Sequence, residues 1–445
     1  MRDIIVAGIV MVGLGYTIRK PYYGVLLWSW LSYMNPHRLC YGFAVWAPFA
    51  QVTAIMVMVS LFISKEKKSL PKNILVYLII IFIIWVGITT IFAFRPEFAS
   101  AYFIRILKIQ FSILLTLMLI NTRQKLEQLL WVITFSIGFY SIKGGLFTLL
   151  TAGSYRVYGP AQSFMAENNA LAIATLMVLP FMFYLRTQVA KPWQKHLMLL
   201  AAFFMGVSAI GSQSRGAFLA ISIIGLYYWL QSNKKILSGL LIVIFVILLA
   251  SFLPEAWYER MSTISSYDQD ASAMGRVTAW ILAFNVANHN IFGGGLDMWS
   301  RQTYFLYLEG YNGSHEAYVA HSIYFSILGE LGWIGLALFL LIFFISWRQC
   351  SGLIKQYRSS VDNQWISDLA KMLRVGLLAY LVGGAFLSLS YFDLPWHLVA
   401  SIVILKEIAS STSKKLKLDD GDNSQEESDQ QEEPKKQVSS NGFLR

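Results

Sequence analysis

Six basic side chains lie in or beside apolar segments, where a charge normally needs a partner or a function. They are Arg105 and Lys108 in YFIRILKIQF, Lys143 in YSIKGGLF, Arg156 in SYRVYGPAQSF, Arg215 in SQSRGAF and Arg276 in SAMGRVTAWILAF. Charged residues in such segments usually face a protein interior or a water-filled cavity, and they often mark functional sites. Several cations around one cavity would suit a phosphate or diphosphate, because the planar arginine guanidinium can donate two hydrogen bonds to one phosphate. Lys108 and Lys143 have a simpler alternative, since a lysine can extend its amine to the membrane surface without any function.

His321 has the most suggestive position of the histidines, because it stands where an apolar helix is predicted to begin in HEAYVAHSIYFSILGELGWIGL. A helix N-terminus disfavours the imidazolium ion, so a histidine there tends to stay neutral and able to accept a proton. Nearby arginines would lower its pKa in the same direction. His321 could equally be a capping or packing residue. His315, six residues earlier, is expected to be a loop residue.

Metal-dependent and nucleotide-dependent chemistry has little support. His315 and Glu316 are not followed by the second histidine of the zinc-protease motif, and the cysteine spacing fits no zinc site. Asp268 and Asp270 in YDQDAS have a spacing that could hold a metal ion, but a solvated surface is the simpler interpretation. We therefore expect neither a metal nor another cofactor.

These candidate residues must be positioned by membrane helices. The chain of 445 residues is 56% hydrophobic and only 14% charged, whereas a soluble globular protein has about a quarter charged residues. The sequence predicts an all-α, polytopic membrane bundle of 12 or 13 transmembrane helices, in which the first two segments are short and could instead form a re-entrant hairpin. The predicted apolar segments are 4–18, 22–34, 43–63, 74–94, 99–120, 127–150, 168–185, 197–214, 216–231, 236–253, 322–347, 372–391 and 396–409.

Basic clusters in alternate loops predict the orientation of the bundle. They are Arg19 and Lys20, the lysines from Lys65 to Lys72, Arg123 and Lys125, Arg186 to Lys195, Lys234 and Lys235, and the residues from Arg348 to Arg374. The positive-inside rule makes these loops cytoplasmic. It also accounts for the net charge of +11 without nucleic acid as a partner.

Four parts follow from this orientation: an N-terminal transmembrane bundle (1–253), a long periplasmic loop (254–320), C-terminal transmembrane helices (321–409) and a disordered cytoplasmic tail (410–445). The tail is predicted to be disordered because it is charged and poor in aromatic residues. Cys40 and Cys350 fall on opposite sides of the membrane, which argues against a disulfide between them.

Within the long loop, SAMGRVTAWILAFNVANHN is predicted to form an amphipathic helix that lies against the membrane face of the bundle. Its apolar stripe would consist of Val277, Trp280, Ile281 and Phe284.

The segments SQSRGAF, GRVTAW and AHSIYFSILGELGWIGL, in this order, resemble the O-antigen ligase/polymerase superfamily. MRDIIV, WLSYMNPHRL and YRVYGPAQSFMAENNALA are similar to its exosortase A-associated O-glycosylation ligase branch. The resemblance covers residues 1–409. It departs from the branch at Glu167, where the branch has aspartate, so that the carboxylate is kept and its reach is changed.

The resemblance implies a metal-independent, inverting glycosyl transfer on the periplasmic face of the bacterial inner membrane. A glycan on undecaprenyl diphosphate would pass to a hydroxyl of a glycan, lipid or protein acceptor, among membrane lipids and without a cofactor. By motif, Arg215 and Arg276 would hold the diphosphate and stabilise it as it leaves. His321 would act as general base or orient the acceptor.

Outside those motifs, we expect Arg105, Lys108 and Arg156 to make further diphosphate contacts, and Glu167 to contact the sugar or the acceptor.

Two alternative functions remain open. A polymerase of the same superfamily would extend a lipid-linked glycan, and only the branch resemblance favours a ligase over it. A lipid-linked oligosaccharide flippase or another transporter would need cations along a path through the whole membrane. The predicted cations instead cluster at the outer ends of the helices.

Overall fold

The computed structural model describes the whole chain except residues 67, 253–254, 256–257, 259–270, 314–316 and 432–445. The described residues form fifteen α-helices and three short 3-10 helices and no strand, which confirms the all-α prediction. Each predicted apolar segment falls on an α-helix of its own. The α-helices are α1 (Arg2–Arg19), α2 (Tyr22–Met34), α3 (Phe49–Ile63), α4 (Ile74–Ile91), α5 (Pro96–Leu119), α6 (Arg123–Leu150), α7 (Asn168–Gln188), α8 (Pro192–Gly211), α9 (Arg215–Gln231), α10 (Lys235–Phe252), α12 (Ala271–His289), α13 (Arg301–Tyr307), α14 (Ile323–Tyr357), α15 (Gln364–Gly383) and α16 (Asp393–Gln431).

Among the described residues, seven helices are long and apolar enough to span a membrane. They are α4, α5, α6, α7, α8, α14 and the segment Gln364–Phe386 that contains α15. The chain is therefore a multi-pass membrane protein. The twelve or thirteen predicted spans include shorter helices such as α2, whose 13 residues are fewer than the roughly 20 that a straight crossing requires.

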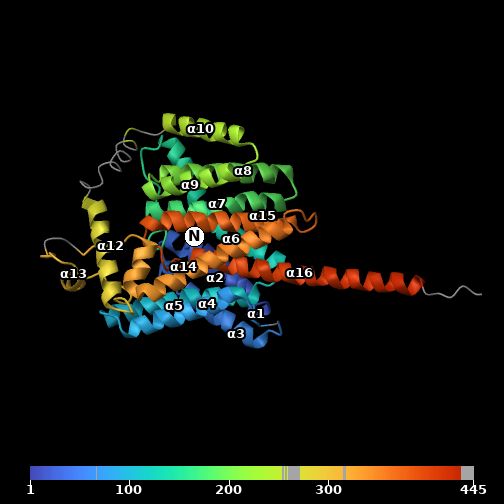
Figure 1. The fold of residues 1–445 in the computed structure, drawn as a ribbon, viewed down its shortest axis with the longest axis horizontal. Coiled ribbons are helices and arrows are strands. Elements are labelled where there is room, and N and C mark those ends of the chain that lie inside the picture. The colour runs from blue at the N-terminus through green and yellow to red at the C-terminus, as the bar shows by residue number, and fades with distance from the viewer. Residues whose placement is uncertain (67, 253–254, 256–257, 259–270, 314–316, 432–445) are drawn as a thin grey trace, which may run out of the picture.

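Most of these helices run side by side, and the bundle has two distinct ends (Figure 1). Helix α12 crosses one end, whereas α16 projects from the other.

Three loops that carry predicted cytoplasmic basic clusters meet one another. Lys125 Nζ lies 3.3 Å from a carboxylate oxygen of Glu66, and Arg123 donates a hydrogen bond of 3.0 Å to Gln188.

The predicted outer loops also contact one another. Asn168 donates a hydrogen bond of 2.7 Å to the carbonyl oxygen of Ser212, and Arg95 forms an ion pair of 3.2 Å with Asp297. The grouping of the loops agrees with the predicted alternation along the chain. The assignment of the cytoplasmic side continues to rest on the positive-inside rule.

Helix α12 forms where an amphipathic helix was predicted, and the four residues of the predicted apolar stripe differ in burial. Ile281 and Phe284 are exposed, and Val277 and Trp280 are half-buried. The buried stripe consists of Ala279, Leu282, Ala283, Val286 and Ala287. Alanines allow a close approach to α14, because a Cβ on Gly329 would lie only 3.1 Å from the Cβ of Ala283.

Helix α16 continues past Ser410 as far as Gln431, and the disorder of residues 410–445 stays a prediction. Figure 1 shows this extension projecting well beyond the bundle.

Cys40 and Cys350 are both free and buried.

A break in α14 organises the end of the bundle that α12 crosses. Gly332 has a φ of 68°, which interrupts the helix. The three carbonyl groups that precede it accept hydrogen bonds from outside the helix. The pairs are Gly294 N to Gly329 O at 2.8 Å, Gly295 N to Glu330 O at 3.0 Å, and Trp85 Nε1 to Leu331 O at 2.9 Å. Backbone carbonyls inside a membrane protein need such partners, because lipid supplies none.

We predict that Gly295→Ala destabilises the protein, because Gly295 has a φ of 77° and an added Cβ would lie 2.2 Å from the Cβ of Ala93. The strain of an alanine in the left-handed backbone conformation and the steric clash of its Cβ should together lower the free energy of unfolding by roughly 2 to 5 kcal/mol. Thermal unfolding in detergent micelles measures the loss. Gly206→Ala in α8 is the control, since a Cβ there meets nothing within 4 Å. Equal melting temperatures for the two variants would contradict the role assigned to this turn.

Candidate functional site

Two adjoining cavities lie at the end of the bundle that carries the outer loops. The smaller one, of about 260 Å³, is called the histidine cavity and is lined by Arg105, Ser163, Phe164, Ala166, Glu167, Ala170, His321, Leu387, Ser388 and Leu389. The larger one, of about 500 Å³, is called the aromatic cavity and is lined by Phe98, Ala101, Tyr102, Arg105, Asp297, Trp299, Val319, Ser326, Glu330, Ser388, Ser390 and Tyr391. Arg105 and Ser388 line both cavities, so these two residues form their common border.

His321 lies two residues before α14 and lines the histidine cavity. Its φ of 44° is left-handed, a conformation that costs a residue other than glycine about 1–3 kcal/mol. Its Nδ1 lies 3.5 Å from Ser388 Oγ. Strain of this kind collects at functional sites, because packing around such sites holds residues in conformations they would otherwise leave.

The pKa of His321 is lowered from its ordinary value of 6.5. Burial is the largest cause, because it removes the hydration of the charged form. The positive charge of Arg276 lowers the pKa further, and the negative charge of Glu167 opposes this. The direction agrees with the sequence-based expectation, although burial contributes more than the arginine. The imidazole is therefore mainly neutral at pH 7 and can accept a proton.

Arg276 lies in the first turns of α12, and α12 is attached to the backbone just before His321. Trp280 Nε1 donates a hydrogen bond of 2.7 Å to the carbonyl oxygen of Ala320. The Trp280 ring also stacks on Phe325, with 4.9 Å between the ring centroids. These contacts hold the start of α12 close enough to His321 for the charge of Arg276 to act on it.

Arg215 is the first residue of α9 and follows a tightly fixed turn. Ser214 caps the helix with its side chain, and Gln213 has a left-handed φ of 54°. A Cβ on Gly216 would lie 3.6 Å from the carbonyl oxygen of Gly383, which begins the segment leading to the histidine cavity. Arg215 is thus next to that segment, but it is not among the residues that line either cavity.

Arg105 and Glu167, both predicted as substrate contacts, come together with His321 in the histidine cavity. The guanidinium carbon of Arg105 lies 4.2 Å from the centroid of the Phe164 ring, which fixes the charge at the border of the two cavities. Glu167 precedes α7 and has an exposed side chain.

Lys108, Arg156 and Lys143 are exposed and line neither cavity. His315, Asp268 and Asp270 lie outside the described residues. Within the part of the chain that the structure describes, no group of three or more histidine, cysteine, aspartate or glutamate side chains is arranged to hold a metal ion.

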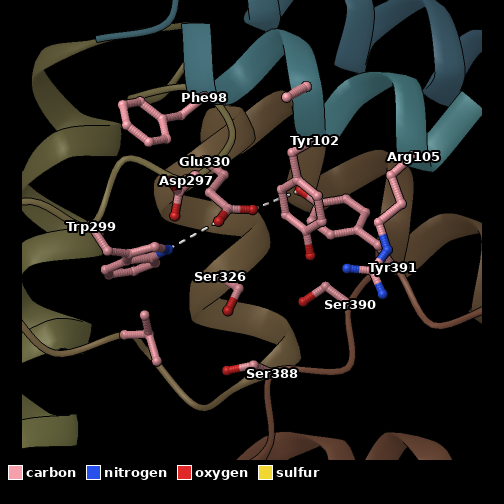
Figure 2. A pocket seen from close by; sticks show the side chains of 12 residues that line it. Phe98, Tyr102, Arg105, Asp297, Trp299, Ser326, Glu330, Ser388, Ser390 and Tyr391 are labelled. Atoms are coloured by element: carbon pink, nitrogen blue, oxygen red, sulfur yellow. Dashed lines mark hydrogen bonds between the residues drawn. The ribbon is translucent and has the colours of Figure 1, made fainter. Parts of the chain in front are cut away.

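The aromatic cavity is built around Glu330, a residue of α14 (Figure 2). Its carboxyl group accepts hydrogen bonds from Trp299 Nε1 at 2.9 Å and from the Tyr391 hydroxyl at 2.8 Å. The Glu330 side chain is 4% exposed, and Tyr102 and Tyr391 pack edge to face beside it at 5.5 Å. One carboxyl group thus joins the loop after α12, helix α14 and the loop before α16.

Asp297 lies on the same wall of the cavity as Glu330 (Figure 2). Arg95 forms an ion pair of 3.2 Å with its carboxylate and also donates to its carbonyl oxygen. Burial raises the pKa of Asp297, and Arg95 opposes this by favouring the charged form. The backbone of Asp297 has a left-handed conformation, with a φ of 57°. The turn after Gly295 therefore directs the Asp297 side chain into the cavity.

Apart from Arg105, the sequence-based site omits the residues of the aromatic cavity, although one signal for them is present. Glu330 is an ionisable residue inside the apolar segment ILGELGWIGL, and such residues are functional candidates by default. Asp297 and Trp299 give no comparable signal, because they stand in a polar loop where these residue types are common.

Two family models match the chain. Residues 200–340 match the family described as O-Antigen ligase, and residues 1–190 match a family of unknown function, DUF5935. The first match contains Arg215, Arg276 and His321, and the second contains Arg105 and Glu167. No curated protein matches the chain. The narrower exosortase A-associated branch stays a prediction, because neither family model distinguishes it.

We predict that Arg276→Gln raises the pKa of His321, because it removes a positive charge that disfavours the imidazolium ion. Histidine-labelled protein can be titrated by NMR in detergent, with His321 assigned by the loss of its signal in His321→Gln. Arg358→Gln, at the exposed end of α14, is the control. An unchanged His321 titration in Arg276→Gln would show that the arginine does not act on the imidazole.

Proposed function

We propose that this membrane protein, whose residues 200–340 match the O-Antigen ligase family, moves a glycan from undecaprenyl diphosphate to an acceptor hydroxyl. The reaction is an inverting, metal-independent glycosyl transfer at the end of the bundle that α12 crosses. That end faces the periplasm of a bacterial inner membrane in this proposal, as the positive-inside rule predicts.

The observation that carries the proposal is the setting of His321. It is a strained, mainly neutral histidine in a cavity that also contains Arg105, and the charge of Arg276 reaches it. A neutral imidazole beside fixed cations suits a reaction in which one group loses a proton while another gains negative charge.

The chemistry is a single displacement. His321 takes the proton of the acceptor hydroxyl, and the hydroxyl oxygen attacks the anomeric carbon of the donor sugar. The bond from that carbon to the diphosphate oxygen breaks, and its electron pair leaves with undecaprenyl diphosphate. Attack from the face opposite the leaving group inverts the anomeric centre.

The arginines stabilise the leaving group in this scheme. Arg215 and Arg276 hold the diphosphate, and Arg105 contacts it from the border of the histidine cavity. Their guanidinium groups favour the transition state because negative charge grows on the bridging oxygen. Glu167 contacts the sugar or the acceptor, and Lys108 and Arg156 remain candidates for weaker contacts farther from the two cavities.

A polymerase would use the same donor and the same groups, with a second lipid-linked glycan as acceptor. The product therefore distinguishes it from a ligase. In vitro transfer from a defined undecaprenyl-diphosphate glycan, followed by mass spectrometry of the labelled product, identifies the acceptor. A transporter is disfavoured by the gathering of Arg105, Arg276 and His321 at one end of the bundle.

We predict that Arg276→Ala and Arg215→Ala each lower the rate of transfer in membrane vesicles by about 100-fold to 1,000-fold, the usual effect of removing one transition-state contact. Glycan transfer is followed with the labelled donor. Arg358→Ala is the matched control, because this exposed arginine lies at the far end of α14. Near-normal transfer by Arg276→Ala would remove the diphosphate contact from the scheme.

The transfer rate should depend on pH through His321. Because its pKa is lowered from 6.5, the neutral form that accepts the proton persists to below pH 6.5 and is lost only as the pH falls further. We expect kcat/KM to be level near pH 7 and to decline in acid with an apparent pKa below 6.5. A decline centred above 6.5, or the same acid limb in His321→Gln, would mean that another group titrates.

A further inference from the structure

We infer that the aromatic cavity binds a sugar ring without a carboxylate group, that is, a neutral or amino sugar. This inference rests on the proposed function and adds a substrate class to it. The cavity is separate in its lining from the cations that the scheme assigns to the diphosphate, apart from Arg105 at the border.

The lining has the composition that sugar recognition requires. Aromatic side chains from three elements, Tyr102, Trp299 and Tyr391, surround the space with flat apolar faces. Hydroxyl groups of serine residues stand among them. A small-molecule site typically combines apolar and aromatic walls with a few placed polar groups, and about 500 Å³ is within the usual range for one.

Glu330 is held ready to accept hydrogen bonds from a ligand. One carboxyl oxygen accepts from Trp299 Nε1 and the other from the Tyr391 hydroxyl, at 2.9 and 2.8 Å. Each oxygen of a carboxylate has about two acceptor positions, and the backbone amide of Asp297 donates to the same group, so about one position remains for a sugar hydroxyl. The three donors also fix the orientation of the group before any ligand arrives.

Asp297 adds a second acceptor in a fixed position, because Arg95 holds it from behind. The guanidinium carbon of Arg95 lies 3.8 Å from the centroid of the Phe98 ring, and its Nη1 contacts two oxygens of Asp297 at 3.2 Å each. Arg95 itself does not line the cavity. The carboxylate of Asp297 therefore faces the space, while its counter-ion stays in the wall.

The charges of the cavity select against acidic sugars. Among its twelve lining residues, Asp297 and Glu330 carry carboxyl groups, and Arg105 is the one cation. A uronic acid would bring a further carboxylate beside these two carboxyl groups, in a space where water is partly removed and Arg105 is the one lining residue that could compensate its charge. Sugar hydroxyl or amino groups instead donate to the oxygens already present.

The shared border connects the sugar to the reaction. Arg105 and Ser388 line both cavities, and Ser388 Oγ lies 3.5 Å from His321 Nδ1. The ring in the aromatic cavity is either the first sugar of the donor or the sugar that bears the acceptor hydroxyl. Both sources have the same chemistry at this cavity.

The test is steady-state transfer by the full-length protein in proteoliposomes. Donors and acceptors are supplied in matched pairs. Either a neutral hexose or the corresponding uronic acid is the diphosphate-linked sugar of the donor or the hydroxyl-bearing sugar of the acceptor. We expect the wild type to use the hexose form at least about tenfold better than the uronic form of one substrate. Asp297→Asn is the first variant, because asparagine also tolerates the left-handed backbone conformation at this position. It should reduce the preference for the hexose over the uronic acid about tenfold and raise KM for the hexose substrate.

The KM that increases in these variants, that for the donor or that for the acceptor, shows which substrate places its sugar ring in the cavity. An increase confined to the donor assigns the cavity to its first sugar, and an increase confined to the acceptor assigns it to the acceptor sugar. Tyr102→Phe is a second variant, which keeps the ring and the ion pair of Asp297 but removes the hydroxyl group that points into the cavity (Figure 2). Loss of that polar group should raise the same KM about threefold. Asp362→Asn, on an exposed loop between α14 and α15, is the matched control.

Equal use of hexose and uronic substrates by the wild type, or unchanged KM values in both cavity variants, would overturn the inference. A different result would contradict the proposed function, namely that the wild type transfers no glycan to any acceptor. Melting temperatures of the variants in detergent separate a lost contact from a lost fold, and Tyr102→Phe tests the inference if Asp297→Asn unfolds.

Discussion

The break in α14 at Gly332 is the constraint on which the rest of this end of the protein depends. A helix buried in a membrane cannot leave carbonyl groups without partners. Here, the carbonyls of residues 329 to 331 are satisfied by the Gly294 and Gly295 amides and by the Trp85 indole. The same hydrogen bonds that repair the break attach both the turn after α12 and helix α4 to α14. The turn that supplies them also leads directly to Asp297 and Trp299, so the repair of the helix and the construction of the aromatic cavity are one arrangement.

Charge is distributed unequally between the two cavities, and this distribution is consistent with a substrate that has two chemically different parts. Arg105 lines both cavities. The histidine cavity also contains Glu167 and receives the positive field of Arg276, whereas the aromatic cavity contains Asp297 and Glu330. The histidine cavity would therefore suit an anionic diphosphate, and the adjoining aromatic cavity would suit an uncharged sugar. Arg105 lies at the border of the two cavities, with its guanidinium carbon 4.2 Å from the centroid of the Phe164 ring.

All the α-helices except α13 could be predicted from the sequence, because nearly all of them are separate apolar segments between polar loops. The link between Arg276 and His321 agrees with the expected effect of arginine on the histidine pKa. The buried stripe of α12 could not be predicted in full. That helix is apolar on most sides, and the small volume of Ala283 against Gly329, rather than hydrophobicity, decides which side is buried. Lys108 shares a helical face with Arg105, but three residues advance a helix by about 4.5 Å, and the cavity border ends before that point. The cavity around Glu330 depends on contacts between residues far apart in the chain, which no local pattern records.

The hydrogen bond between Trp85 and Leu331 joins positions 246 residues apart. At roughly 5–20 residues per second, a ribosome needs about 10 to 50 seconds to make the intervening chain. Helix α4 therefore enters the membrane long before its partner on α14 exists. Arg95, just beyond the end of α4, is likewise made 202 residues before Asp297. Synthesis thus completes the site only near its end, so that a chain interrupted before α14 carries most of the bundle and none of the finished cavities.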